Sequence, residues 1–319
     1  MTTKIIGPIS LYEMKIPRIS KDKYPKHIYL FGDEHVRNST CLSRDGEHIV
    51  DFISDQILQN QDKIIDVYIE APFRNPLTQN RNYLEDMQRE FRDCLLQNNC
   101  INFPNARFHY VDIRQGNIES ASFKILIEMY FNLLYEFENM EFQNGGDKKL
   151  YEILEKYKEI PVVKEFLKDK DLMEEKLMKK EYSKSNIPEL IIDHYKSKIK
   201  PLLVTLKKSL HFIEISKGKA IAIQSWDKFL SSLIEILSFY VDIYTLLRIF
   251  RPFKKVQGKI RKKEPQNIII YMGEEHTRSI IHFLNEIKGK IVFETRSDKE
   301  KNFQCIDIRG LDLPMFNNF

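Results

Sequence analysis

Two stretches at opposite ends of the chain repeat one pattern of reactive residue types. "HIYLFGDEHVR" covers residues 27–37 and "IIIYMGEEHTR" covers residues 268–278. Each passes from an apolar run through a glycine into two acids, a histidine and, two residues later, an arginine. Imidazole and carboxylate groups bind divalent metals and transfer protons. His35 and His276 are therefore the first candidates for a functional site.

Polar residues also end two further β-like runs. Glu70 ends "IIDVYIE", and Asp112 and Arg114 end "FHYVDIR". Ligands of open α/β sheets sit outside the carboxyl ends of the strands, so we expect these residues to share one cleft with the two histidines. Glu34 and Glu275, each beside a histidine in the sequence, are expected to orient it or to act as a general base.

Gly32 and Gly273 each precede one of the two histidines by three residues. Glycine adopts positive φ angles readily or lets another stretch of backbone approach closely. We therefore expect each glycine to turn the chain at a strand end, so that the following histidine faces the cleft.

Short runs of β-branched and aromatic residues predict the strands that position these side chains. They cover residues 9–14, 27–31, 64–70, 107–113, 267–272, 290–294 and 303–308. Helix-like segments such as "EHIVDFISDQILQN" and "NYLEDMQREFRDCLLQNN" alternate with the first of them. This order predicts an α/β fold with a mostly parallel central sheet flanked by helices.

The middle of the chain follows a different pattern. Apolar residues recur there at helical spacing without a convincing strand, as in "SFKILIEMYFNLLYEFENM". We therefore predict a large all-helical insertion at 117–265, between the two parts of an α/β core domain at 1–116 and 266–319.

The composition is that of a folded globular chain, with 42% hydrophobic and 30% charged residues. A net charge of +4 gives no reason to expect specific nucleic-acid binding.

The four cysteines show no CxxC pair and fit reduced thiols. The most apolar stretch, 229–250, contains Glu235, Asp242 and Arg248 and is typical of a buried helix rather than a membrane span. With no signal peptide visible, we expect a cytoplasmic protein.

Together these motifs resemble the erythromycin esterase-like, ChaN, TraB and Tiki superfamily. The resemblance rests on two GxxH motifs, a glutamate in "YIEAP" and the Asp-x-Arg of "VDIR", and it covers residues 27–116 and 266–319. It implies an α/β sheet with a helical elaboration and a site made of His35, Glu70, Arg114 and His276. Members include proteins that look like metal-dependent proteases, esterases that hydrolyse a lactone with a histidine-activated water, and haem-binding proteins.

The opening "GPISLYEMK", followed by "YLFGDEH", also resembles proteins of large DNA viruses of amoebae. This second resemblance implies that the protein works in the host cytoplasm or in the virion. It adds nothing about chemistry.

The first hypothesis for the site is metal-assisted hydrolysis of an ester or peptide bond. His35, His276 and Glu70 would bind a divalent Mn, Co or Zn ion, which lowers the pKa of a bound water to about 7. Arg114 would neutralise developing negative charge, with Asp112 orienting it. A second hypothesis needs no metal, because one histidine oriented by Glu70 would deprotonate the water itself.

A third hypothesis is a protein that binds without catalysing, with a vestigial or haem-type site. Its support is the basic run "RIFRPFKKVQGKIRKK" at 248–263, which suits an acidic partner or an anionic membrane surface. Haem is less favoured than a divalent metal as the cofactor. Under the first two hypotheses the partner is a small-molecule or peptide substrate, and the sequence leaves the oligomeric state open.

Overall fold

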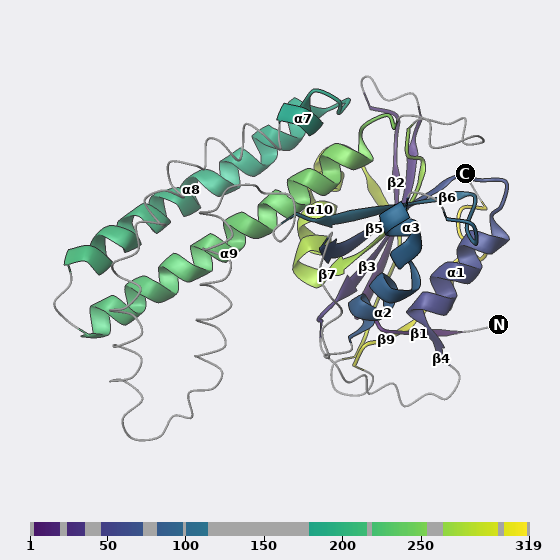
Figure 1. Ribbon diagram of the computed structural model, residues 1–319, viewed down its shortest axis with the longest axis horizontal. Coiled ribbons are helices and arrows are strands. Elements are labelled where there is room, and N and C mark those ends of the chain that lie inside the picture. Colours follow the sequence, from purple (N-terminus) through teal and green to yellow (C-terminus); the bar gives the residue numbers. More distant parts are fainter. Residues whose placement is uncertain are drawn as a thin grey trace.

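The chain folds into a body of strands and helices from which a long helical hairpin extends (Figure 1). The computed structural model describes residues 3–19, 24–35, 46–72, 82–97, 100–113, 179–215, 219–253, 264–298 and 303–317. All structural statements below concern these residues.

The main sheet has six strands in the order β6-β5-β7-β3-β2-β8. The strands are β2 (Ser10–Ile16), β3 (Lys26–Asp33), β5 (Ile65–Pro72), β6 (Ala106–Asp112), β7 (Asn267–Gly273) and β8 (Lys290–Arg296). The four strands β6, β5, β7 and β3 are parallel, whereas β2 is antiparallel to both of its neighbours. The predicted α/β class with a mostly parallel sheet is confirmed.

A second sheet has three short strands in the order β4-β1-β9. They are β1 (Lys4–Ile6), β4 (Gly46–His48) and β9 (Cys305–Asp307). The last of them lies within the seventh predicted strand. The other two were not predicted, because three residues are too few to show an alternating pattern.

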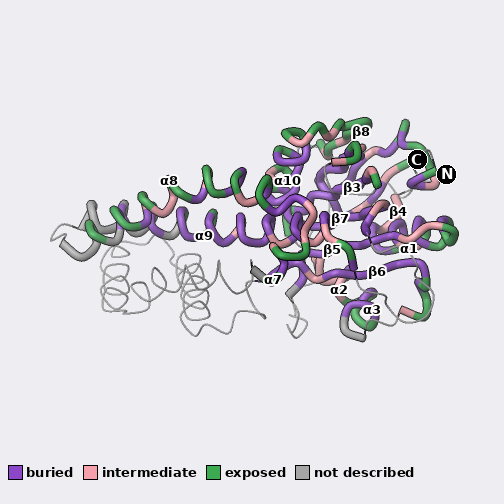
Figure 2. The backbone as a smooth tube through the Cα atoms, turned by 90° about the horizontal axis from the view of Figure 1, so that it is seen from above, coloured by how far each residue is buried: buried purple, intermediate pink, exposed green. Residues whose placement is uncertain are grey.

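Both faces of the central strands are covered, whereas the edge strand β8 is largely exposed. Successive residues of a strand point to opposite faces of the sheet. In β3, Ile28 and Leu30 join one apolar cluster, whereas Tyr29 and Phe31 join another. The second cluster includes helices α1 (Ile49–Gln59), α2 (Tyr83–Glu90) and α3 (Arg92–Gln97). Figure 2 shows how completely the central strands are buried. This burial explains why the strands read as continuous apolar runs.

The first cluster joins the sheet to helices of the predicted insertion. These are α8 (Pro188–Ile215) and α9 (Lys219–Ile249), with α10 (Glu274–Glu286) completing the cover of this face. A short helix, α7 (Lys179–Tyr182), precedes them, and the predicted helix at 122–140 lies outside the described residues. Whether the chain divides at 117 and 265 stays a prediction. Among the described helices, none combines the length and apolarity needed to cross a membrane.

The cysteines differ from the sequence prediction of reduced thiols. Cys94 and Cys100 form a disulfide with a Cα–Cα distance of 4.4 Å, and Cys305 is also disulfide-bonded. Cys94 lies in α3, and the spacing of six residues to Cys100 does not by itself reveal the pairing. Disulfides persist in oxidising compartments, so the cysteines no longer support a reducing one.

A buried charged network connects α9 to the parallel strands. Asp66 of β5 accepts hydrogen bonds from Arg107 at 2.7 and 2.5 Å and contacts His109 Nε2 at 2.8 Å. Arg248 of α9 donates to His109 Nδ1 at 2.9 Å, and Phe253 stacks on the same ring. Burial, together with the charges of Arg248 and Arg107, lowers the pKa of His109 to about 4, although Asp66 opposes the shift.

This network predicts acid destabilisation that depends on His109. The ring has a pKa near 6.5 when unfolded and about 4 when folded. The contribution of the neutral His109 ring to the unfolding free energy is therefore fully present above pH 6.5. About 3 kcal/mol of unfolding free energy is lost as the pH falls from 6.5 toward 4. His109→Gln, which keeps a donor and an acceptor, should remove this part of the pH dependence. Urea unfolding of both proteins at several pH values measures this difference. If the unfolding free energy changed with pH equally in the two proteins, the pH dependence would not come from His109.

Candidate functional site

Three adjacent parallel strands bring the central candidates together. Glu70 lies near the carboxyl end of β5, His276 lies in the first turn of α10 directly after β7, and His35 follows β3 by two residues. Because the strand order is β5-β7-β3, the three side chains come from neighbouring strand ends. The structure thus gathers three residues that were predicted to meet at this edge of the sheet.

Glu70 lies between the two histidines. Its Oε2 is 3.3 Å from His35 Nε2, and its Oε1 is 3.3 Å from His276 Nε2. The backbone N–H of Gly273 donates to Oε2 at 2.7 Å. The side chains of Glu70 and His276 are buried, whereas that of His35 is 35% exposed. One buried carboxylate therefore faces both imidazole Nε2 atoms, and His35 provides the contact with solvent.

Two further carboxylates hold the opposite nitrogen of each ring. His276 Nδ1 lies 2.6 Å from Asp242 Oδ1, and His35 Nδ1 lies 3.2 Å from Asp33 Oδ2. Gln304 donates to the other oxygen of Asp33 at 3.1 Å. A carboxylate at Nδ1 fixes the orientation of the ring and directs Nε2 toward whatever the site binds.

Neither of these carboxylates was predicted to take part in the site. Asp33 belongs to the "GDEH" motif itself and lies two residues before His35, so the motif contained the signal. Asp242 comes from α9, inside the predicted insertion, and was noted only as an acid within an apolar stretch. The site is therefore built from the α/β core and from the helical part together.

The two glycines are explained by close approach. A Cβ at Gly273 would lie 3.0 Å from His35 Nε2 and 3.3 Å from Glu70 Oε2. A Cβ at Gly32 would overlap the side chains of Ser10 and Glu274, which hydrogen-bond to each other. Neither glycine has a positive φ, so a left-handed backbone conformation is not the reason for glycine at these positions. At both positions a larger side chain would force the neighbouring polar side chains to move.

The unusual backbone angle belongs to His35 instead. Its φ is 56°, in the left-handed region that residues other than glycine rarely adopt. Such a conformation costs on the order of 1–3 kcal/mol and occurs preferentially at functional sites. It turns His35 at the end of β3, whereas the second motif enters α10 directly at Glu274. The two similar motifs thus present their histidines by different local structures.

Carboxylates raise the pKa of both histidines. Burial disfavours the protonated form of His276, but the charges of Glu70 and Asp242 outweigh it and raise the pKa to about 10. Burial also disfavours the protonated form of His35, but the hydrogen bonds of this ring to Asp33 and Glu70 outweigh the burial and raise its pKa to about 10. Both rings therefore lie where positive charge is favoured, and protons or a metal cation can supply it.

The two glutamates predicted beside the histidines lie at the surface, whereas Asp112 is buried at the same edge of the sheet, in register with Pro72 of β5. Glu275 is 89% exposed, with Arg278 Nη1 at 3.8 Å, and Glu34 is also exposed. The orienting role that was expected of these two glutamates falls to Asp33 and Asp242. Asp112 is buried at the end of β6.

Part of the predicted site and the basic run lie at the limits of the described chain. Arg114 lies outside the described residues, as do residues 254–263 of the basic run. The first two arginines of that run make internal contacts, Arg248 with His109 and Arg251 with Glu181. These two side chains are thus engaged within the fold, and surface binding by this run stays a prediction.

For a cation held by His276 Nε2, the carboxylate at Nδ1 predicts a measurable effect on affinity. Asp242→Asn keeps the shape of the side chain but removes the charge that orients the ring. Losing such a partner weakens metal binding by about 10- to 100-fold. Calorimetric titration with Mn²⁺ measures the change, and Asp55→Asn, on the exposed face of α1, is the matched control. Equal affinities in the Asp242 variant and the wild type would remove Asp242 from the site.

Fold and geometry together define an α/β protein with a His–Glu–His site at the strand ends. Scans against family models, curated proteins and solved structures found no match to this chain. Membership of the superfamily that the motifs resemble therefore stays a prediction, and function has to be argued from the site itself.

Proposed function

We propose that this protein is a hydrolase in which His35, Glu70 and His276 bind a divalent metal ion for the cleavage of an ester or peptide bond. The observation that carries the proposal is the convergence of both histidine Nε2 atoms on one buried carboxylate, at 3.3 Å each. Each Nε2 faces a different oxygen of that carboxylate.

Each residue has a defined part in this proposal. Asp33 and Asp242 keep a proton on each Nδ1, so that Nε2 is the nitrogen that each ring would offer to a metal once the Nε2 proton has left. The Gly273 N–H holds one oxygen of Glu70 in place. A divalent ion, when bound, supplies a water with a pKa near 7, which is a nucleophile at neutral pH. The partly exposed His35 leaves a route for water and substrate.

The same contacts argue against a histidine that acts alone as the base. A general base needs a free lone pair at working pH. In this site each ring has a carboxylate at Nδ1 and another at Nε2. Such surroundings keep the rings protonated at neutral pH, and a protonated imidazole cannot accept a proton. His35, His276 and Glu70 would hold a metal cation in place of those protons, and its charge would balance the same carboxylates.

The substrate is proposed to carry negative charge or to develop it during the reaction. Arg114 follows the end of β6, the strand beside β5, and its guanidinium suits a substrate carboxylate or an oxyanion. Asp112 would orient it. Esters and peptides both meet this requirement, and the superfamily resemblance includes both reactions.

A substrate screen tests the proposal. Metal-free protein should show no cleavage of a panel of nitrophenyl esters and fluorogenic peptides, and Mn²⁺, Co²⁺ or Zn²⁺ should restore it. Activity that survives exhaustive chelation would instead support the histidine-base route. If no cleavage appears with any of the metals, and none of them binds, the hydrolase proposal fails. The hypothesis of a protein that binds without catalysing would then remain.

A further inference from the structure

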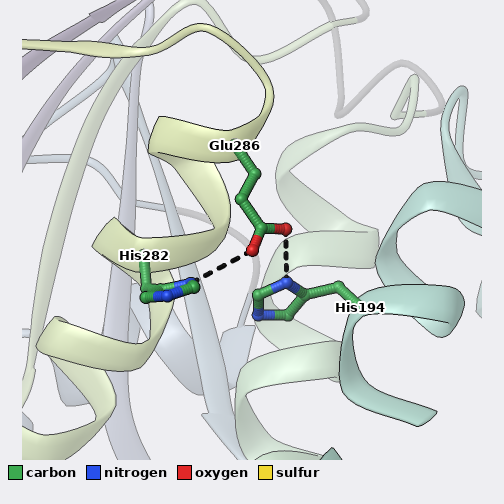
Figure 3. A group of neighbouring side chains, drawn as sticks. All are labelled: His194, His282 and Glu286. Atoms are coloured by element: carbon green, nitrogen blue, oxygen red, sulfur yellow. Dashed lines mark hydrogen bonds and ion pairs between the residues drawn. The ribbon is translucent and has the colours of Figure 1, made fainter. Parts of the chain in front are cut away.

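A second group of histidines and a carboxylate lies away from the strand-end site, between α8 and α10. It consists of His194 from α8 and of His282 and Glu286 from α10 (Figure 3). His194 Nδ1 lies 2.6 Å from Glu286 Oε2, and His282 Nδ1 lies 3.4 Å from Glu286 Oε1. One ligand atom from each residue lies within 4.8 Å of the other two.

The residue types and spacing are those of a transition-metal site. His282 and Glu286 are four residues apart on one helix, so their side chains project from the same face. His194 supplies the third ligand from a different helix. Two imidazoles and one carboxylate form a three-ligand set that leaves a position for water, and imidazole ligands suit Zn²⁺ better than Mg²⁺ or Ca²⁺.

The group combines a fixed ligand with two accessible ones. The His194 side chain is only 4% exposed, and the rings of Tyr195 and Phe283 pack edge-on against it at 4.8 and 5.3 Å. The side chains of His282 and Glu286 are 61% and 51% exposed. The buried ring is thus held in place, while the exposed pair lets an ion enter from solvent without any opening of the fold.

We propose that His194, His282 and Glu286 form a second, surface metal site that binds Zn²⁺ and fastens α8 to α10. An ion there would link the helical hairpin to the helix that begins with Glu274 and carries His276. The hairpin also provides Asp242, which orients His276. Zinc bound between α8 and α10 would therefore stabilise the packing of the hairpin that carries Asp242. The site needs no catalysis and does not depend on the proposed hydrolase function.

The test isolates this site from the strand-end site. In the His35→Ala/His276→Ala variant we expect one Zn²⁺ per chain to bind and to raise the melting temperature, with Co²⁺ giving a visible absorption band. Adding His282→Ala, a change at an exposed side chain, should weaken binding by at least about 100-fold, more than the loss of an orienting partner would. His211→Ala, at an exposed histidine elsewhere on α8, should leave it unchanged.

Two results would overturn the proposal. One is the absence of zinc binding by the double variant, and the other is unchanged binding after His282→Ala. If the double variant does not fold, His282→Ala in the otherwise intact chain replaces it, and zinc stoichiometry should fall by one ion. Failure at this site leaves metal-dependent hydrolysis untouched, because that activity is measured with His35 and His276 present.

Discussion

Replacing both His35 and His276 with alanine is expected to abolish metal-dependent hydrolysis, with the rate constant falling at least about 10³-fold. The two side chains provide both Nε2 atoms that face Glu70, so a single carboxylate would be left to hold the ion. Without a bound metal, the pKa of the attacking water returns from about 7 toward that of bulk water. Initial rates with the best substrate of the ester and peptide panel measure the loss.

The control for this variant is an exposed histidine, His211→Ala on α8, which should keep full activity. Circular dichroism establishes that the double variant folds. A folded double variant that still hydrolyses substrate at the wild-type rate would show that the strand-end histidines have no part in the reaction.

The largest effect on stability is expected at Asp66. This side chain is fully buried and is the carboxylate that pairs with the buried Arg107 and contacts His109. Asp66→Asn keeps its volume but removes the negative charge that pairs with the Arg107 guanidinium. Breaking a buried pair in this way costs about 3–5 kcal/mol of unfolding free energy. Urea denaturation at neutral pH measures the change.

Asp55→Asn makes the same substitution at an exposed position of α1 and should alter the unfolding free energy by no more than about 0.5 kcal/mol. If both aspartates gave the same small change, the network of Asp66, Arg107 and His109 would not stabilise the junction of α9 with the sheet.

The strands and three residues of the site could be predicted because their signals are local. A strand that is buried on both faces reads as a short apolar run, and "IIIYM" in β7 is such a run. Parallel strands end at one edge, so a polar residue at each end is placed without knowledge of the strand order. His35, Glu70 and His276 are placed at the site by this rule.

The residues that were missed depend on contacts distant in sequence or on local geometry. Asp242 precedes His276 by 34 residues, and no periodicity shows that α9 docks beside the strand ends. Glu275 was assigned a role because it neighbours His276. In the first turn of a helix, however, adjacent side chains point about 100° apart, so Glu275 faces solvent when His276 faces the site. His194 is also far in the sequence from His282 and Glu286 on α10, so its contact with Glu286 could not be predicted.

The most direct test of the account is the metal content of protein purified without a chelator or a metal-affinity tag. The comparison uses His282→Ala, which disables the surface site, with and without the added changes His35→Ala and His276→Ala. We predict about one metal ion per chain in the first protein and none in the second. Equal metal content in the two proteins, or none in either after incubation with Mn²⁺, Co²⁺ and Zn²⁺, would contradict a metal site at His35, Glu70 and His276.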